Sequence, residues 1–290
     1  MTGPSGPAGP TWRGDAPEEA RLSAGGWARV ALRGPALALV VVLGVLVKLP
    51  LRLIERPLCG QRRPVTPWIT QAVARLGMAI LGIGLEARGP QLQGAGALVA
   101  NHASWLDIFA LNARRNVYFV SKAEVSGWPV IGFLARLAGT VFITRDPRAA
   151  VEQKRVFEER LLHGHRLLFF PEGTSTDGQR VLPFKPTLFA AFFNDPLRHE
   201  MALQAVTVIW RAPAGEDPRF YGWWGDMSFG GHLLRTLASL RQGQVTTIYH
   251  TPLAVADFEN RKALAQACEA QVRAAHPSAG LATPNPAELR

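Results

Sequence analysis

The sequence of 290 residues has only two cysteines, Cys59 and Cys268, which lie far apart. They give neither a disulfide scaffold nor the paired spacing of a cysteine zinc site, and they favour a reducing compartment. Charged residues make up only 19% of the chain, against 48% hydrophobic residues. This composition excludes a disordered, a collagen-like or a coiled-coil protein, and it raises the question of contact with a membrane.

Several motifs of nucleotide and hydrolase chemistry are also missing. There is no P-loop, and Gly82 and Gly84 do not belong to a dinucleotide fingerprint. No Gly-x-Ser-x-Gly elbow supplies a nucleophile. His163 and His165 are spaced like metal ligands but have no third ligand nearby in the sequence. We therefore expect no metal, no bound cofactor and, in the absence of a recognisable motif, no nucleic-acid partner.

The formal net charge is +10, and arginine carries most of the positive charge because only five residues are lysine. Such a balance predicts an anionic partner, but a bilayer surface and a phosphorylated substrate fit equally well. The planar guanidinium group suits phosphate, although a genome rich in G and C gives the same bias. The charge alone does not identify the partner.

Residues 36–47 form an uninterrupted apolar run with basic residues on both sides. The run is shorter than the roughly 18–20 residues that span a bilayer. It reaches that length if it continues to Ile54 and if Lys48 and Arg52 extend their charged ends to the membrane surface. We predict a membrane anchor, embedded or spanning, and keep a buried core helix as the alternative. Positive charge at both ends gives no clean orientation.

The rest of the chain divides into segments of different composition and apolar pattern. Residues 68–85 are apolar but broken by Arg75 and by glycines, which indicates an interfacial or amphipathic helix. The first residues are rich in Gly, Pro and Ala and lack the features of a secretory signal. The predicted units are a disordered lead (1–26), a membrane-anchoring helical region (27–90), an α/β domain (91–276) and a loose tail (277–290).

Short apolar runs alternate with helical patterns after Gly94, which is typical of an α/β layer fold. Asp146 and Pro147 predict the start of a helix that ends at Gly164, and Asp257 predicts the cap of a closing helix. The predicted strands cover residues 97–100, 117–120, 139–144, 167–170, 203–210 and 245–249.

A possible acid–base pair follows the first of these strands, in the segment from Asn101 to Asp107. Side chains five positions apart on one helix point about 140° away from each other. If the helix begins with Ser104 as its N-cap, His102 lies in the turn before it and can face Asp107 at the third helical position. This would give a base with an orienting carboxylate at the carboxyl end of a strand. The alternative is an ordinary cap beside a surface histidine.

Two later segments end strands with groups that suit a phosphate or an acyl carbonyl. Arg145 follows the strand at 139–144, and Glu172, Gly173 and Thr174 begin a loop of small and hydroxyl residues. Taken alone, each is more often a solvated arginine or an ordinary turn. Because no Gly-x-Ser-x-Gly elbow supplies a nucleophile, the hydroxyl to be activated would belong to the substrate.

Together, the His-x-x-x-x-Asp segment, the strand-end arginine and Phe-Pro-Glu-Gly-Thr resemble the glycerolipid acyltransferase family, specifically the bacterial lysophosphatidic acid acyltransferases. The resemblance covers about residues 80–210 and implies an α/β fold with a mixed sheet flanked by helices. It implies that His102 is the general base and that Asp107 holds its tautomer. The base would deprotonate the hydroxyl of a lysophospholipid, which attacks the thioester of acyl-CoA or acyl carrier protein.

The resemblance also implies a binding site for the acceptor phosphate. Arg145 would contact this phosphate, and Glu172, Gly173 and Thr174 would form its loop. Lys122 matches a further family lysine, although a lysine that merely flanks a strand fits equally well.

Two positions depart from the family pattern. Pro186 replaces a small residue, and Ala205 stands where a proline is usual, so no role is transferred there. The expected activity is the formation of phosphatidic acid from 1-acylglycerol-3-phosphate, on the cytoplasmic face of a bacterial inner membrane with an anionic surface. Residues 220–227 resemble a segment of some bacterial members, including lyso-ornithine lipid acyltransferases, although an aromatic belt at the membrane interface or a core cluster fits equally well. Lyso-ornithine lipid or another lysolipid is an alternative acceptor. A non-catalytic lipid-binding protein is a second alternative.

Overall fold

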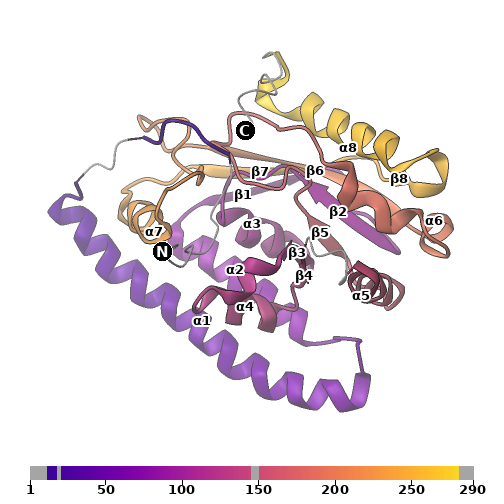
Figure 1. Ribbon diagram of the computed structural model, residues 1–290. Helices are drawn as coiled ribbons and strands as arrows, with labels where there is room; N and C mark the ends of the chain where they lie inside the picture. Colours follow the sequence, from indigo (N-terminus) through magenta and orange to yellow (C-terminus); the bar gives the residue numbers. More distant parts are fainter. Residues whose placement is uncertain (1–11, 18–20, 145–149, 281–290) are drawn as a thin grey trace, which may run out of the picture.

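Short apolar segments form the strands of one central sheet, and amphipathic segments cover both of its faces (Figure 1). The computed structural model describes residues 12–17, 21–144 and 150–280. The strands are β1 (Gly84–Arg88), β2 (Gly96–Ala100), β3 (Tyr118–Lys122), β4 (Val141–Ile143), β5 (Leu167–Phe169), β6 (Ala202–Arg211), β7 (Gln244–Tyr249) and β8 (Leu253–Ala254). The helices are α1 (Ala24–Cys59), α2 (Thr66–Leu81), α3 (Leu106–Arg114), α4 (Ile131–Ala138), α5 (Ala150–Leu162), α6 (Leu197–Glu200), α7 (Phe229–Ala238) and α8 (Arg261–Ala275). Single 3₁₀ segments cover Ala123–Gly127, Pro186–Phe193, Val255–Asp257 and Pro277–Gly280.

The described strands are ordered β1-β7-β6-β2-β5-β3-β4, with β8 pairing with β6. The pairs of β6 with β7 and with β8 are antiparallel, and the other pairs are parallel. The sheet is therefore mixed and flanked by helices, as predicted. Strand β2 is buried along its whole length between β5 and β6, so the turn after Ala100 starts from the rigid centre of the sheet.

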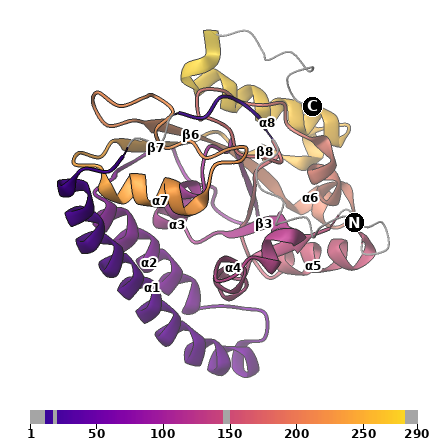
Figure 2. The ribbon, with the colours of Figure 1, turned by 60° about the vertical axis from the view of Figure 1, so that its left-hand side comes forward.

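Helix α1 is long and apolar enough to anchor the chain in a membrane. Ser23 caps it, it runs for 36 residues, and its most apolar window has a mean hydropathy of 2.4 with only 6% of that window buried. This exposure rules out the alternative of a buried core helix. Figure 2 shows α1 and α2 side by side on the edge of the molecule away from α8.

Polar residues on α1 turn inward toward α2 instead of outward. Lys48 is 5% exposed, and its ammonium group donates to the hydroxyl of Thr70. The Glu55 carboxylate accepts from the backbone N–H groups of Val65 and Thr66, at 2.7 and 3.0 Å, and from the Thr66 hydroxyl at 2.6 Å. The Lys48 side chain therefore does not meet the condition of extending toward the membrane surface, because α2 supplies its partner.

The second apolar stretch is partly helix and partly strand. Helix α2 ends at Leu81, where Gly82 takes a left-handed conformation with φ 79°. Residues 84–88 then form β1, which pairs with β7 at the sheet edge. The prediction of a helix through Leu85 is thus wrong at its end, and the sheet includes residues that we placed in the helical region.

Three further predictions need correction or lie outside the described chain. Helix α3 begins at Leu106, not with Ser104 as its N-cap, and Trp105 precedes it without a side-chain cap. Asn260, not Asp257, caps α8, because its side chain accepts from two backbone N–H groups of the first turn. Asp146 and Pro147 lie outside the described residues, and helix α5 is described from Ala150.

The segment 12–17 was predicted as part of a disordered lead, but it packs against the domain. Trp12 is 7% exposed and lies edge-to-face with Trp224 at a ring separation of 5.7 Å. The Trp224 indole donates to the Gly14 carbonyl at 3.0 Å, and Arg13 pairs with Asp226 at 2.5 Å. Burial of a large aromatic ring explains this order within a stretch rich in glycine and proline.

Candidate active site

The site begins where β2 leaves the centre of the sheet. The side chain of Asn101 pairs with the backbone of Val208 on β6, donating to its carbonyl at 2.9 Å and accepting from its N–H at 2.7 Å. Asn101 is 1% exposed, so both hydrogen bonds form away from water. They fix the first residue after the strand and hence the start of the turn that carries His102.

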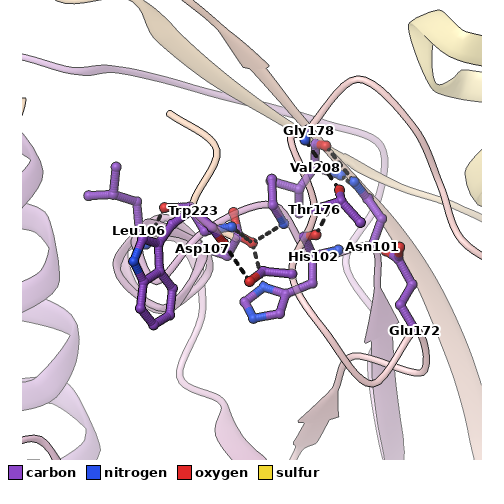
Figure 3. Close-up of polar contacts among 12 residues, drawn as sticks. Asn101, His102, Leu106, Asp107, Glu172, Thr176, Gly178, Val208 and Trp223 are labelled. Carbon is purple, nitrogen blue, oxygen red and sulfur yellow. Dashed lines mark hydrogen bonds and ion pairs between the residues drawn. The ribbon is translucent and has the colours of Figure 1, made fainter. Parts of the chain in front are cut away.

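His102 and Asp107 meet as the sequence spacing suggested (Figure 3). The His102 Nδ1 lies 2.7 Å from Asp107 Oδ2, and the His102 side chain is 19% exposed while that of Asp107 is fully buried. Because a carboxylate accepts hydrogen bonds, this contact places the imidazole proton on Nδ1 and leaves Nε2 as the nitrogen that can take a proton. The ring of Phe170 stacks on the imidazole at 3.9 Å and 12°, which fixes the ring plane.

Asp107 is held by three further donors. Its Oδ2 accepts from the backbone N–H groups of Ala103 and Ser104 at 2.8 and 3.0 Å. Its Oδ1 accepts from the indole N–H of Trp210 on β6 at 2.6 Å. Four donors around a buried carboxylate fix its orientation. Nothing in the local sequence pointed to Trp210, which lies 103 positions away.

Glu172 supports the turn that carries His102 from the other side. Its carboxylate accepts from the backbone N–H of His102 at 2.7 Å and from that of Leu182 at 2.8 Å. The residue is 1% exposed, and burial raises the pKa of this carboxyl to about 8, with the nearby charge of Asp107 acting in the same direction. Both oxygens are therefore used to hold backbone, and we assign Glu172 to positioning His102 instead of to contact with a substrate.

Replacing Glu172 with glutamine should change how stability depends on pH. The unfolded carboxyl ionises near 4.5, whereas the folded carboxyl keeps its proton until about pH 8. Between these values the folded state binds the extra proton, so wild-type stability falls as pH rises, and above pH 8 the contribution is lost. Glu172→Gln cannot titrate, so its thermal midpoint should fall less between pH 5 and 8 than that of the wild type. If the thermal midpoint fell equally with pH in the two proteins, Glu172 would not hold a proton in the folded state between pH 5 and 8.

The loop after Glu172 holds the turn along its other edge (Figure 3). Thr176 donates to the His102 carbonyl from its backbone N–H at 3.0 Å and from its hydroxyl at 3.3 Å. The backbone N–H of Trp223 donates to the Ala103 carbonyl at 2.8 Å. The His102 backbone is thus bonded on both its N–H and its carbonyl side, which leaves the imidazole little freedom to move.

The structure places the other predicted site residues around this centre. Gly173 has a φ of +73°, and a Cβ there would come within 2.8 Å of the Lys185 ammonium. Lys185 therefore lies beside the predicted loop, although the sequence analysis gave it no role. The hydroxyl of Thr174 accepts from the backbone N–H of Trp12 at 3.1 Å, so the segment 12–17 contacts this loop. Lys122 ends β3 and is half-buried. Arg145 lies outside the described residues.

Taken together, these contacts orient an imidazole that can act as a general base. The imidazole is oriented by a buried carboxylate, and its ring lies at the carboxyl ends of β2 and β5, where α/β folds bind ligands. Such a base suits deprotonation of a hydroxyl group on a substrate.

The family model "Acyltransferase" matches residues 86–197. A lyso-ornithine lipid O-acyltransferase of Rhodobacter capsulatus is 57% identical over 91% of this chain and 96% of that protein. The chain belongs to this acyltransferase family. A 1-acyl-sn-glycerol-3-phosphate acyltransferase of Neisseria meningitidis is 45% identical over 41% of this chain and 49% of that protein. The LPA acyltransferase PlsC of Thermotoga maritima has the same fold, with a TM-score of 0.59 at 18% identity over 90% of this chain and all of that one.

The family membership confirms the sequence-based resemblance and the prediction of an O-acyltransferase acting on lysolipids. The comparisons support lyso-ornithine lipid, the alternative acceptor, better than 1-acylglycerol-3-phosphate, the acceptor of the main prediction. The relative matched over nearly its full length is named for lyso-ornithine lipid, whereas the match to the Neisseria acyltransferase covers less than half of this chain.

Proposed function

We propose that this acyltransferase transfers an acyl chain to the free hydroxyl of lyso-ornithine lipid. The observation that carries the proposal is the 57% identity over 91% of the chain to a protein of that name. Two further relatives with the same name, from Brucella abortus and Rhizobium meliloti, are 37% and 35% identical over 74% and 73% of this chain. The similarity thus extends beyond residues 86–197, which the family model matches.

The site geometry supports a mechanism of direct transfer. Nε2 of His102 takes the proton of the acceptor hydroxyl as its oxygen attacks the carbonyl carbon of an acyl thioester. The carbon–sulfur bond then breaks, and the thiolate of coenzyme A or acyl carrier protein leaves with the proton from the imidazolium. Asp107, 2.7 Å from Nδ1, stabilises the imidazolium between the two steps. No resident cofactor takes part in this scheme.

The headgroup would lie against the loop that starts at Gly173. In this proposal Thr174, Lys122 and Arg145 contact the acceptor, while Glu172 holds the backbone of His102. The membrane anchor α1 would keep the site at a bilayer surface, where single-chain lipids are concentrated. We place the protein on the cytoplasmic face of the bacterial inner membrane, where thioester donors are made.

The acceptor can be identified with purified full-length protein and labelled acyl-CoA or acyl carrier protein. Lyso-ornithine lipid and lysophosphatidate are offered separately in the same detergent, and the diacylated product is quantified for each. We expect a higher kcat/KM for lyso-ornithine lipid. A preference for lysophosphatidate would instead support the second candidate, which the similarity to the Neisseria acyltransferase favours. Turnover of neither acceptor, with an intact His102, would contradict both.

A further inference from the structure

Three arginines lie close enough for their charges to repel one another near the end of the α1–α2 pair. The guanidinium groups of Arg63 and Arg160 lie over the ring of Tyr118, 5.5 and 4.5 Å from its centroid. Both also meet Gly139, because Arg160 donates to its carbonyl at 3.0 Å and a Cβ on Gly139 would clash with Arg63. Arg52 is the third, on the last part of α1.

These positive charges outnumber the carboxylates beside them. Glu55 is 3.8 Å from Arg52 but already accepts three hydrogen bonds from the start of α2. Glu159, whose charge raises the pKa of Arg160, pairs with Arg155 at the surface of α5. Burial, and then repulsion from Arg63, lowers the pKa of Arg160 to about 10. The cluster is therefore short of negative charge.

Two of the arginines also have hydrogen-bond donors without partners. Nε of Arg63 and Nη1 of Arg52 are buried and make no hydrogen bond to a residue that the structure describes. A buried N–H group without an acceptor destabilises the fold, and more so when it is charged. A phosphate group accepts hydrogen bonds from several guanidinium donors at once, and it supplies the negative charge that the cluster lacks.

We propose that Arg52, Arg63 and Arg160 hold the phosphate group of an anionic membrane phospholipid. The lipid origin is favoured by the apolar surface around the cluster. Beyond Arg52 on α1, Leu53 and Leu58 are 68% and 77% exposed. On α2, Trp68 is 62% exposed, and tryptophan is enriched at the membrane interface. A phosphate at the arginines places the acyl chains along these side chains. The site is separate from the acceptor site and does not depend on the identity of the acceptor.

The test uses full-length protein in nanodiscs made of phosphatidylcholine alone or of equal parts phosphatidylcholine and phosphatidylglycerol. Phosphatidylglycerol should raise the thermal midpoint of the wild type by about 5 °C or more when it is well above its dissociation constant. Arg63→Gln should lose more than half of this shift. Arg62→Gln is the matched control, because it removes the same charge from the neighbouring exposed position and should keep the shift.

An equal shift for Arg63→Gln and Arg62→Gln would overturn the proposal, because it would show a diffuse attraction of basic residues to the membrane. Inorganic phosphate, added to protein in phosphatidylcholine nanodiscs, tests the other source of the anion. If it reproduces the full shift, the assignment to a lipid is wrong. If Arg63→Gln does not fold, Arg52→Gln is measured in the same way, with the same expected loss.

Discussion

Replacing His102 with alanine is expected to lower kcat/KM for acyl transfer by about 10²–10⁴-fold, the usual contribution of a positioned general base. The imidazole is the group whose free nitrogen can take the acceptor proton, since Nδ1 is held by Asp107 at 2.7 Å. The residual rate would come from holding the two substrates together, which the variant still does. The rate is measured with purified protein and a labelled acyl donor.

His163→Ala provides the matched control, because it removes an exposed histidine from α5's C-terminal end. It should keep the wild-type rate. His102→Ala removes a ring that stacks on Phe170, so its thermal midpoint and membrane association are measured alongside its activity. A folded, membrane-bound His102→Ala protein with at least a third of the wild-type rate would exclude a general base at this position.

The predictable parts of the fold and site depend on local sequence. The apolar run at 97–100 gave β2, because a strand buried on both faces needs consecutive aliphatic side chains. The proximity of His102 and Asp107 followed from a spacing of five residues and from a turn placed between them. The predicted helix start was one residue too early, with Trp105 instead of Ser104 at the N-cap, and the contact still forms. The turn sets the contact, and the helix boundary has little influence on it.

The parts that could not be predicted depend on contacts between distant segments. Trp210 donates to Asp107 across 103 positions, and as part of an apolar strand it looked like an ordinary core residue. The role of Glu172 depends on which way its side chain turns at the end of β5, and the sequence does not specify that direction. Strand β1 alternates apolar and charged residues at a sheet edge, so it lacked the apolar run that marked the central strands.

Asp107→Asn is the second substitution with a large expected effect, and it tests the carboxylate with almost no change in shape. The amide has one acceptor oxygen, whereas the carboxylate accepts from His102, Ala103, Ser104 and Trp210 with its two. In the better orientation the amide NH₂ faces the Trp210 indole N–H, and two donors oppose each other. This costs about 1–3 kcal/mol of folding free energy.

The effect of Asp107→Asn on the rate should be larger than its effect on stability. Without the carboxylate, the imidazolium formed during proton transfer loses its charge partner, and the Nδ1–H tautomer is no longer favoured. An amide in the corresponding position of a serine-protease triad lowers kcat by about 10⁴-fold, and we expect a loss of up to that size here. The measurement is kcat, together with the thermal midpoint, for Asp107→Asn and for the matched single variant Trp210→Phe.

The double variant Asp107→Asn with Trp210→Phe separates the two effects. Trp210→Phe removes the N–H that opposes the amide, so Asp107→Asn should destabilise the protein less in this background than in the wild type. The rate should stay low in both, because restoring the packing around residue 107 does not return the negative charge beside Nδ1. If the double variant regained both stability and activity, Asp107 would act only by holding the turn, and its negative charge beside His102 would have no part in acyl transfer.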